Sequence, residues 1–305
     1  MMSFRMMIML ITIITSTLVE AELLIKPKGV DFLRISPDVR GSSLGDVGAS
    51  LHKTGVSGVY WNPANSIGKQ EIAFIHHELI EGIRYEFIGY SAGLKDANIA
   101  ITLAYLHMGK IIGRDEFKNP HEYSSYKMVS NISYAKKIQY FTWGLTLKNV
   151  YSKIESEKAK CLGLDLGMLY NGPYNLDDNL GIGISLSNIK LTEYRFIREA
   201  EKLPMSFRFG IHYQEFPRGV LTIVELNSEK NRKVKYGVGI EYPIFKDNVD
   251  RNLYIRVGYN SSKGKGFRGG FGVEMKTIGI NYCYEPSSDK HLASMHRIGL
   301  NLSLK

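Results

Sequence analysis

The side chains that could do chemistry do not combine into a catalytic arrangement. His76 and His77 are adjacent, so in the strand expected there they point to opposite faces, and Glu78 adds no His-Glu-x-x-His spacing for zinc. Gly269-Gly270-Phe271-Gly272 lacks the strand–loop–helix context of a phosphate-binding loop. Small residues on one face of a strand explain this glycine run better.

The remaining nucleophiles also fail to define a site. Ser287, Asp289 and His291 lie together in one polar stretch, which a turn explains better than a catalytic triad. Cys161 and Cys283 are far apart and show no metal-binding spacing, so we expect small filler residues, and the sequence leaves a bridge between them open. We therefore predict no enzyme, no metal and no cofactor, with an esterase or protease carried on a barrel as the minor alternative.

Composition separates several classes of protein. The chain has 305 residues, 30 Gly, 19 Tyr and a net charge of +9. A charge of this size can indicate nucleic-acid binding, but the Lys and Arg residues are spread over expected loops and alternate strand positions. We predict no nucleic-acid partner. A basic surface that faces anionic lipid head groups fits as well, and so does a simple solvated excess of charge.

The first 21 residues have the pattern of an export signal. Arg5 supplies the positive charge, Met6 to Ile14 form the apolar run, and Val19 and Ala21 occupy the −3 and −1 positions of a cleavage site. The apolar run is short for a membrane-spanning helix. We therefore predict a signal peptide over 1–21 and an exported protein.

A small N-terminal element is expected over 22–69. Its segment 37–52 is rich in Gly, Ala and Ser, which lets a backbone pack closely against surrounding walls, and a short helix is possible near 43–51. The stretch ends in Tyr60, Trp61, Asn62, Pro63 and Ala64. Pro63 restricts Asn62 to extended or turn geometry, and the Asn62 side chain can bond its own backbone two residues on. Such a turn can close a plug and begin a barrel, or it can be a simple helix-to-strand turn.

From Gln70 to the end, apolar and polar residues alternate with a period of two. In 295–304, for example, Ile298, Leu300 and Leu302 alternate with small or polar residues, which places one apolar face on a strand. We predict about 14 such strands, at 70–78, 84–93, 97–107, 124–135, 139–151, 160–170, 178–188, 204–213, 219–226, 233–242, 252–260, 266–275, 277–285 and 293–304.

A membrane barrel explains this pattern better than a soluble sandwich. The strands are long enough to cross a bilayer at a tilt, and Tyr residues sit near many strand ends, as in the aromatic girdles of such barrels. The face opposite the apolar one carries charges that a dry core would not accept unpaired: Asp165, Arg208, Glu241, Arg256, Arg268, Glu274 and Arg297. The fold class is therefore all-β, an antiparallel transmembrane barrel over 70–305. We expect long outer connections at 108–123 and 190–203.

Several ordered motifs carry a family resemblance. They are Asp31-Phe32-Leu33-Arg34-Ile35, Val39-Arg40-Gly41, Leu44-Gly45-Asp46-Val47-Gly48-Ala49, Val59-Tyr60-Trp61-Asn62-Pro63-Ala64 and, in the last strand, His296-Arg297-Ile298-Gly299-Leu300. In this order they resemble the PorV/PorQ branch of the FadL-like outer-membrane β-barrel proteins. Two departures are Ser42, Ser43 and Leu44 at the first glycine pair and Lys305 in place of a terminal aromatic residue.

The resemblance implies a 14-stranded barrel in the cell outer membrane whose segment 22–69 folds inward as a hatch. Tyr60, Trp61, Asn62, Pro63 and Ala64 would form the hatch turn that gates a ligand path. FadL-like relatives transport hydrophobic, fatty-acid-like small molecules, whereas PorV-type relatives serve type IX protein secretion and surface attachment. We favour the transporter, with the secretion component as the alternative. The expected partners are outer-membrane lipid and lipopolysaccharide, a hydrophobic ligand and, in the alternative, secreted proteins or their machinery.

Overall fold

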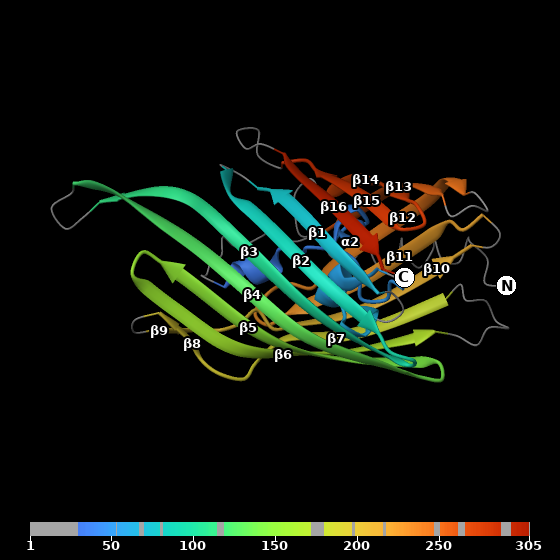
Figure 1. Ribbon diagram of the computed structural model, residues 1–305, viewed down its shortest axis with the longest axis horizontal. Helices are drawn as coiled ribbons and strands as arrows, with labels where there is room; N and C mark the ends of the chain where they lie inside the picture. The colour runs from blue at the N-terminus through green and yellow to red at the C-terminus, as the bar shows by residue number, and fades with distance from the viewer. Residues whose placement is uncertain are drawn as a thin grey trace.

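The protein is a closed antiparallel β-barrel. The computed structural model describes residues 30–52, 54–66, 70–79, 82–114, 119–171, 180–196, 199–215, 218–246, 251–261, 266–287 and 294–304. Each barrel strand pairs with its neighbours in the chain, and β1 pairs with β16 to close the wall (Figure 1). The predicted signal peptide, 1–21, falls outside the described residues.

Fourteen of the described strands form the wall, which confirms the predicted fold class and strand number. They are β1 (Glu71–Glu78), β2 (Arg84–Gly93), β3 (Ala97–Arg114), β4 (Pro120–Ile138), β5 (Phe141–Ile154), β6 (Glu157–Asn171), β7 (Leu180–Lys190), β10 (Ser206–Gln214), β11 (Leu221–Glu229), β12 (Lys235–Lys246), β13 (Asn252–Asn260), β14 (Phe267–Glu274), β15 (Ile278–Glu285) and β16 (Met295–Ser303). We call the end where β1 begins and β16 finishes the terminal end, and the other the loop end.

The outward face of the wall is an apolar band between two rows of aromatic rings. Ile101 and Ile132 are paired across β3 and β4 and are 54% and 59% exposed. On β5 the band runs from Phe141 at the terminal end to Tyr151 near the loop end. A rise of about 3.3 Å per residue and a tilt of about 40° give this band a height of about 25 Å, the thickness of a bilayer's apolar region.

The inward face carries the charges that the alternation predicted. Asp165, Arg208, Glu241, Arg256, Arg268 and Arg297 are all buried, and Glu274 is half-buried. Six buried charges inside a barrel need partners, because an unpaired buried charge is very unfavourable. The wall supplies an ion-pair partner for each of the six, and the N-terminal segment adds further hydrogen bonds and ion pairs to several of them.

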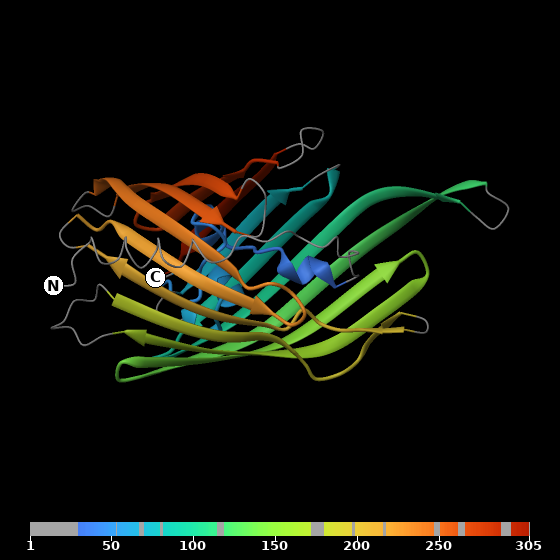
Figure 2. The ribbon, with the colours of Figure 1, turned by 180° about the vertical axis from the view of Figure 1, so that it is seen from behind.

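The N-terminal segment, described over 30–52 and 54–66, lies inside the barrel (Figure 1 and Figure 2). It consists of η1 (Asp31–Arg34), α2 (Val39–Ser43), η2 (Val56–Tyr60) and η3 (Pro63–Ser66). Its helix α2 lies against β13 to β16 and its turn η3 against β4 to β6 on the opposite side. In the described part of the chain no helix is both long and apolar enough to cross a membrane.

The helix expected near 43–51 is wrong in position. The observed helix α2 starts at Val39, because the carboxylate of Asp38 caps it by accepting from the backbone N–H of Gly41 at 2.8 Å. It ends before Gly45 and Asp46, whose φ angles of 96° and 58° are left-handed and stop a helix. The sequence pattern of small residues did not reveal the capping carboxylate.

The prediction of a loop over 108–123 is also wrong. β3 runs to Arg114 and β4 begins at Pro120, so a long hairpin projects from the loop end (Figure 1 and Figure 2). A bulge between His107 and Lys110 shifts the pairing register there. Beyond the apolar band a strand needs no apolar face. The alternation of apolar and polar residues therefore does not reveal the parts of β3 and β4 that extend past the band. The connection at 190–203 carries a short separate hairpin, β8 (Tyr194–Phe196) with β9 (Glu199–Glu201).

A charge placed in the apolar band should destabilise the barrel, whereas the same charge on the projecting hairpin should not. We expect Ile101→Arg to lower the free energy of unfolding by about 2–4 kcal/mol, the cost of an arginine near the bilayer midplane. Ile112→Arg on the same strand, where Ile112 is 74% exposed, should change it by less than about 0.5 kcal/mol. Denaturant unfolding in liposomes measures both, and equal losses would contradict a lipid-facing band.

Candidate functional site

The predicted hatch turn is buried against the wall. Asn62 is fully buried, and its side-chain Oδ1 accepts from the backbone N–H of Ala64 at 3.0 Å, the local bond that the sequence predicted. Its Nδ2 donates to the backbone oxygen of Ala49 at 2.8 Å and of Met168 in β6 at 3.1 Å. One side chain therefore shapes the turn, joins it to an earlier part of the segment and fixes it to the barrel.

Two wall glycines make room for this turn. Gly144 and Gly167 face each other across β5 and β6. A Cβ at Gly144 would overlap the backbone of Pro63 and Ala64, and a Cβ at Gly167 would overlap the Asn62 side chain. The turn lies so close to the wall that only glycine fits at these positions.

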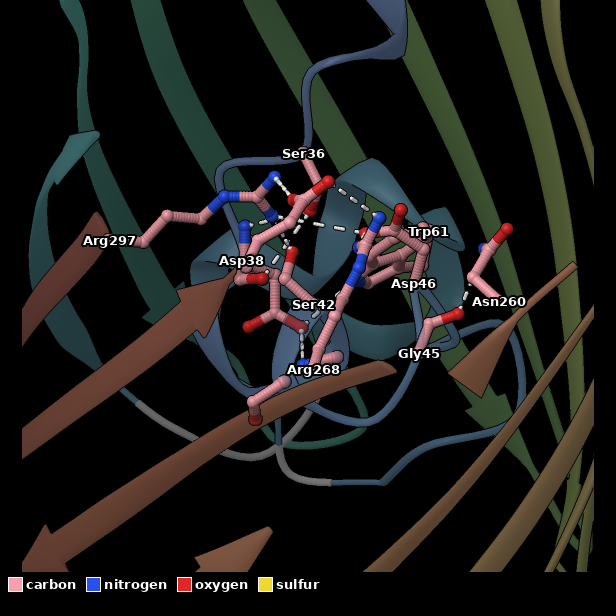
Figure 3. A network of polar contacts seen from close by, with 12 residues as sticks. Ser36, Asp38, Ser42, Gly45, Asp46, Trp61, Asn260, Arg268 and Arg297 are labelled. Carbon is pink, nitrogen blue, oxygen red and sulfur yellow. Dashed lines mark hydrogen bonds and ion pairs between the residues drawn. The ribbon is translucent and has the colours of Figure 1, made fainter. Parts of the chain in front are cut away.

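Asp38 ties three parts of the N-terminal segment together. Its Oδ2 accepts from the indole Nε1 of Trp61 at 2.8 Å (Figure 3). The same oxygen accepts from the backbone N–H of Gly41, and Oδ1 accepts from the hydroxyl of Ser57 at 3.1 Å. Trp61 is 1% exposed, so its N–H needs a partner inside the protein. Asp38 was not among the residues singled out from the sequence.

Glu225, on β11, anchors the segment to the wall. Its Oε2 accepts from the backbone N–H groups of Gly48 and Ala49, each at 2.7 Å. Its Oε1 accepts from Arg208 Nη1 at 3.0 Å, and the Arg208 guanidinium lies 4.8 Å from the Trp61 ring centroid. A buried carboxylate is thus fully partnered only while the segment stays docked. Burial, opposed by Arg208, raises the pKa of the Tyr60 phenol beside them, so Tyr60 stays neutral.

A second carboxylate joins the segment to β12 and β13. Arg40 donates to Glu241 through Nε at 2.8 Å and Nη2 at 2.7 Å, a bidentate pair. Arg256 donates to the same carboxylate through Nε at 2.6 Å. Burial lowers the pKa of Arg40, but the Glu241 carboxylate outweighs it and holds the pKa above its ordinary value, so Arg40 remains charged.

A third cluster surrounds Asp46. Figure 3 shows Asp46 beside Arg268 and Arg297, and it forms ion pairs with both. The same two arginines contact Glu285 on β15, at 3.1 Å and 3.2 Å. Arg297 also donates to the hydroxyl of Ser42. The wall here holds two arginines and one carboxylate, and the segment supplies the second carboxylate.

Two cavities lie on either side of the segment. One, of about 40 Å³, lies between η1, η2 and strands β2 to β6. The other, of about 170 Å³, opens at the terminal end beside Glu71 and Ser303. Residues 37–40 and 54–59 stand between the two cavities, because both cavities are lined from these stretches. The segment therefore divides the lumen.

The predicted site residues separate into two groups. Tyr60, with Phe32, lines the 40 Å³ cavity. Trp61, Asn62, Pro63 and Ala64 line neither cavity and instead fix the segment to β5, β6 and β7. The anchoring carboxylates of the wall and the glycines at 144 and 167 were missed as site residues. Their position on the inward parity of the strands was the one available signal.

The other chemistry-bearing residues stay apart. His77 is buried and the His76 side chain is 44% exposed, on opposite faces as predicted. Cys161 and Cys283 are both buried free thiols. Within the described residues no group of three or more His, Cys, Asp or Glu side chains could hold a metal. Ser287 is described, but Asp289 and His291 lie outside the described residues.

No protein-family model and no curated protein matches the sequence. Solved structures, however, are similar to it in fold. The deltaS2S3 mutant of TodX, a monoaromatic hydrocarbon channel, superposes with a TM-score of 0.60 and 12% identity over 87% of this chain and 97% of that one. TodX itself, the toluene transporter of P. putida, gives 0.52 and 13% over 84% and 94%. At these identities the similarity shows the fold alone.

Gly144→Ala should loosen the hatch turn, because its methyl group overlaps the backbone of Pro63 and Ala64. In a Trp143→Phe background Trp61 is the remaining tryptophan, and we expect its emission to shift to the red and to become accessible to quenchers. Gly163→Ala on the adjacent strand is the control, because its nearest contact is 3.4 Å away. Unchanged emission in both variants would show that the turn is not held by this close approach.

Proposed function

We propose that this chain is a FadL-like channel of the outer membrane that passes hydrophobic small molecules, with the N-terminal segment as its hatch. Three features support this proposal. The barrel resembles TodX in fold, the outward face is an apolar band of bilayer height, and the lumen contains a segment that separates two cavities. The predicted export signal at 1–21 agrees with this location.

The lining of the 40 Å³ cavity is the observation that indicates the class of substrate. Most of its wall is apolar, and the apolar side chains are Phe32, Leu33, Ile35, Val56, Val59, Tyr85, Phe87, Ala104 and Val129. One side is polar, with Thr102, Thr146 and the ion pair of Lys148 with Asp165 at 2.8 Å. A mostly apolar concavity with a few polar groups fits a hydrophobic molecule that carries at most a small polar group.

The cavity's size means that transport requires movement. A buried cavity that accepts benzene measures about 150 Å³, several times the volume here. A hydrophobic ligand therefore enters only if side chains or the segment shift. The segment is the movable part, because its contacts to the wall are side-chain bonds whereas the wall strands hold each other by continuous backbone ladders. The state described is a closed one.

The alternative, a PorV-type component of type IX secretion, has no specific observation in its favour among the described residues. The hairpins at the loop end could contact a polypeptide, but any barrel protein can carry such hairpins. The transporter is therefore the function that we carry forward, and the secreted-protein partner remains a prediction from sequence.

Filling the cavity should block transport. We expect Val129→Trp to reduce uptake of radiolabelled toluene or oleate at least about tenfold, because the indole occupies the cavity that the ligand must cross. Ile132→Trp on the same strand is the control, since that side chain faces lipid and is 59% exposed. Uptake is measured in cells that lack another channel for these compounds. Equal uptake by both variants would remove the cavity from the path, and no uptake by the wild type would overturn the proposed function.

A further inference from the structure

A group of lysines breaks the apolar character of the outward face on strands β5 and β6. Lys153 faces Lys158 across the two strands, and Tyr151 faces Lys160. All three lysines lie on the outward parity, as Tyr151 does, and Lys158 and Lys160 are exposed. We call this group, Lys153, Lys158 and Lys160, the lysine row.

The lysine row sits at a defined height. Leu145 and Leu147, each 45% exposed, lie in the apolar band of the same strand, and Tyr151 marks its loop-end border. Lys153 is one outward position beyond Tyr151, which adds about 7 Å along the strand and about 5 Å along the membrane normal. Positive groups at that height meet the phosphate and head-group layer of a bilayer rather than its hydrocarbon.

Aromatic rings flank the lysine row and lie at the same border. Tyr151 contacts Tyr126 with ring centroids 6.0 Å apart, and Tyr126 contacts Tyr105 at 5.7 Å. Tyr105 stacks on His107 at 6.3 Å. Such a ladder is typical of the aromatic girdle where a barrel leaves the hydrocarbon region. These rings also border the lysine row on the β4 side.

The positive charge of the row is not neutralised by the protein. In the part of the chain that the structure describes, none of the three lysines forms an ion pair. Of the two acidic residues in the same hairpin, Glu155 contacts His121 at 3.3 Å, and Glu157, opposite Ile154 in the strand register, lies on the opposite parity from the lysines. Three ammonium groups on neighbouring strands, with spacing of about 5 Å between strands, match a multiply charged anion.

We propose that the lysine row binds the phosphate groups of lipopolysaccharide in the outer leaflet. The loop end carries the projecting β3–β4 hairpin and the 191–205 connection, and the longer loops of such barrels face the cell exterior. The phosphorylated glycolipid of that leaflet presents its phosphates at the edge of the apolar band, where the ammonium groups lie. The adjoining tyrosine rings pack against its acyl chains and sugar.

The test uses the full chain in detergent micelles, titrated with bisphosphorylated lipid A and with lipid A stripped of phosphate. Lys153→Gln/Lys158→Gln/Lys160→Gln should weaken binding of the phosphorylated lipid at least about tenfold, since each lysine near an anionic lipid surface contributes about fivefold. The charge-matched control is Lys95→Gln/Lys136→Gln/Lys137→Gln at the terminal end, which should change affinity by less than about twofold. Heat-dependent mobility on gels verifies folding, and Lys160→Gln alone serves if the triple variant does not fold.

Three results would overturn the proposal. The first is equal loss in the control, which would indicate a diffuse charge effect. The second is undiminished binding of the phosphate-free lipid, which would indicate recognition of acyl chains alone. The third is equally tight binding of inorganic phosphate, which would indicate an anion site without a lipid.

Discussion

Charge burial inside the barrel is the constraint on which the closed structure depends. The wall places carboxylates and guanidinium groups in the lumen, where an unpaired charge costs several kcal/mol. Glu225 has Arg208 but still needs donors for its second oxygen, and the backbone of Gly48 and Ala49 provides them. Glu241 likewise has Arg256 and completes its shell with Arg40. The Glu225 and Glu241 carboxylates are therefore fully paired only while the N-terminal segment is in place.

In the proposed channel, this arrangement would let the hatch be firm and still removable. Its contacts to the wall are a few charge-assisted bonds and close glycine approaches, not a continuous hydrogen-bond ladder. Breaking them together would open the lumen of the proposed channel while the strands stay paired. Water that enters the lumen can solvate the exposed charges, which lowers the cost of the open state relative to a dry interior. The lumen charges that hold the closed state together thus also limit its stability, because water can solvate them in the open state.

The strands could be predicted because the two faces of the wall have different surroundings. Ile132 and Leu145 face lipid while Asp165 and Arg256 face inward, and this alternation gave the number of strands and their parity. The long β3–β4 hairpin could not be predicted in this way, because both of its faces lie outside the band and no longer differ. The position of α2 was missed for a related reason: its start depends on the Asp38 cap and its end on two left-handed residues, not on periodicity.

The site was predictable only in part. The motif at 60–64 marked a real turn, but its neighbours in space come from β5, β6 and β7, about a hundred residues later in the chain. A sequence alone lists inward charges such as Arg208 and Glu241 without telling which segment completes them. The glycines at 144 and 167 likewise read as small residues of a strand. Only the structure shows that they make room for the turn at Pro63.

The most direct test of this account is the single-channel conductance of Glu225→Gln in planar bilayers. Losing the charge leaves Arg208 buried without its carboxylate and weakens the bonds to Gly48 and Ala49. We predict a closed wild-type barrel and repeated openings in the variant, with no openings in Glu86→Gln, whose side chain lies on the outer face and is 49% exposed. A variant as closed as the wild type would contradict the claim that buried charges hold the hatch in place.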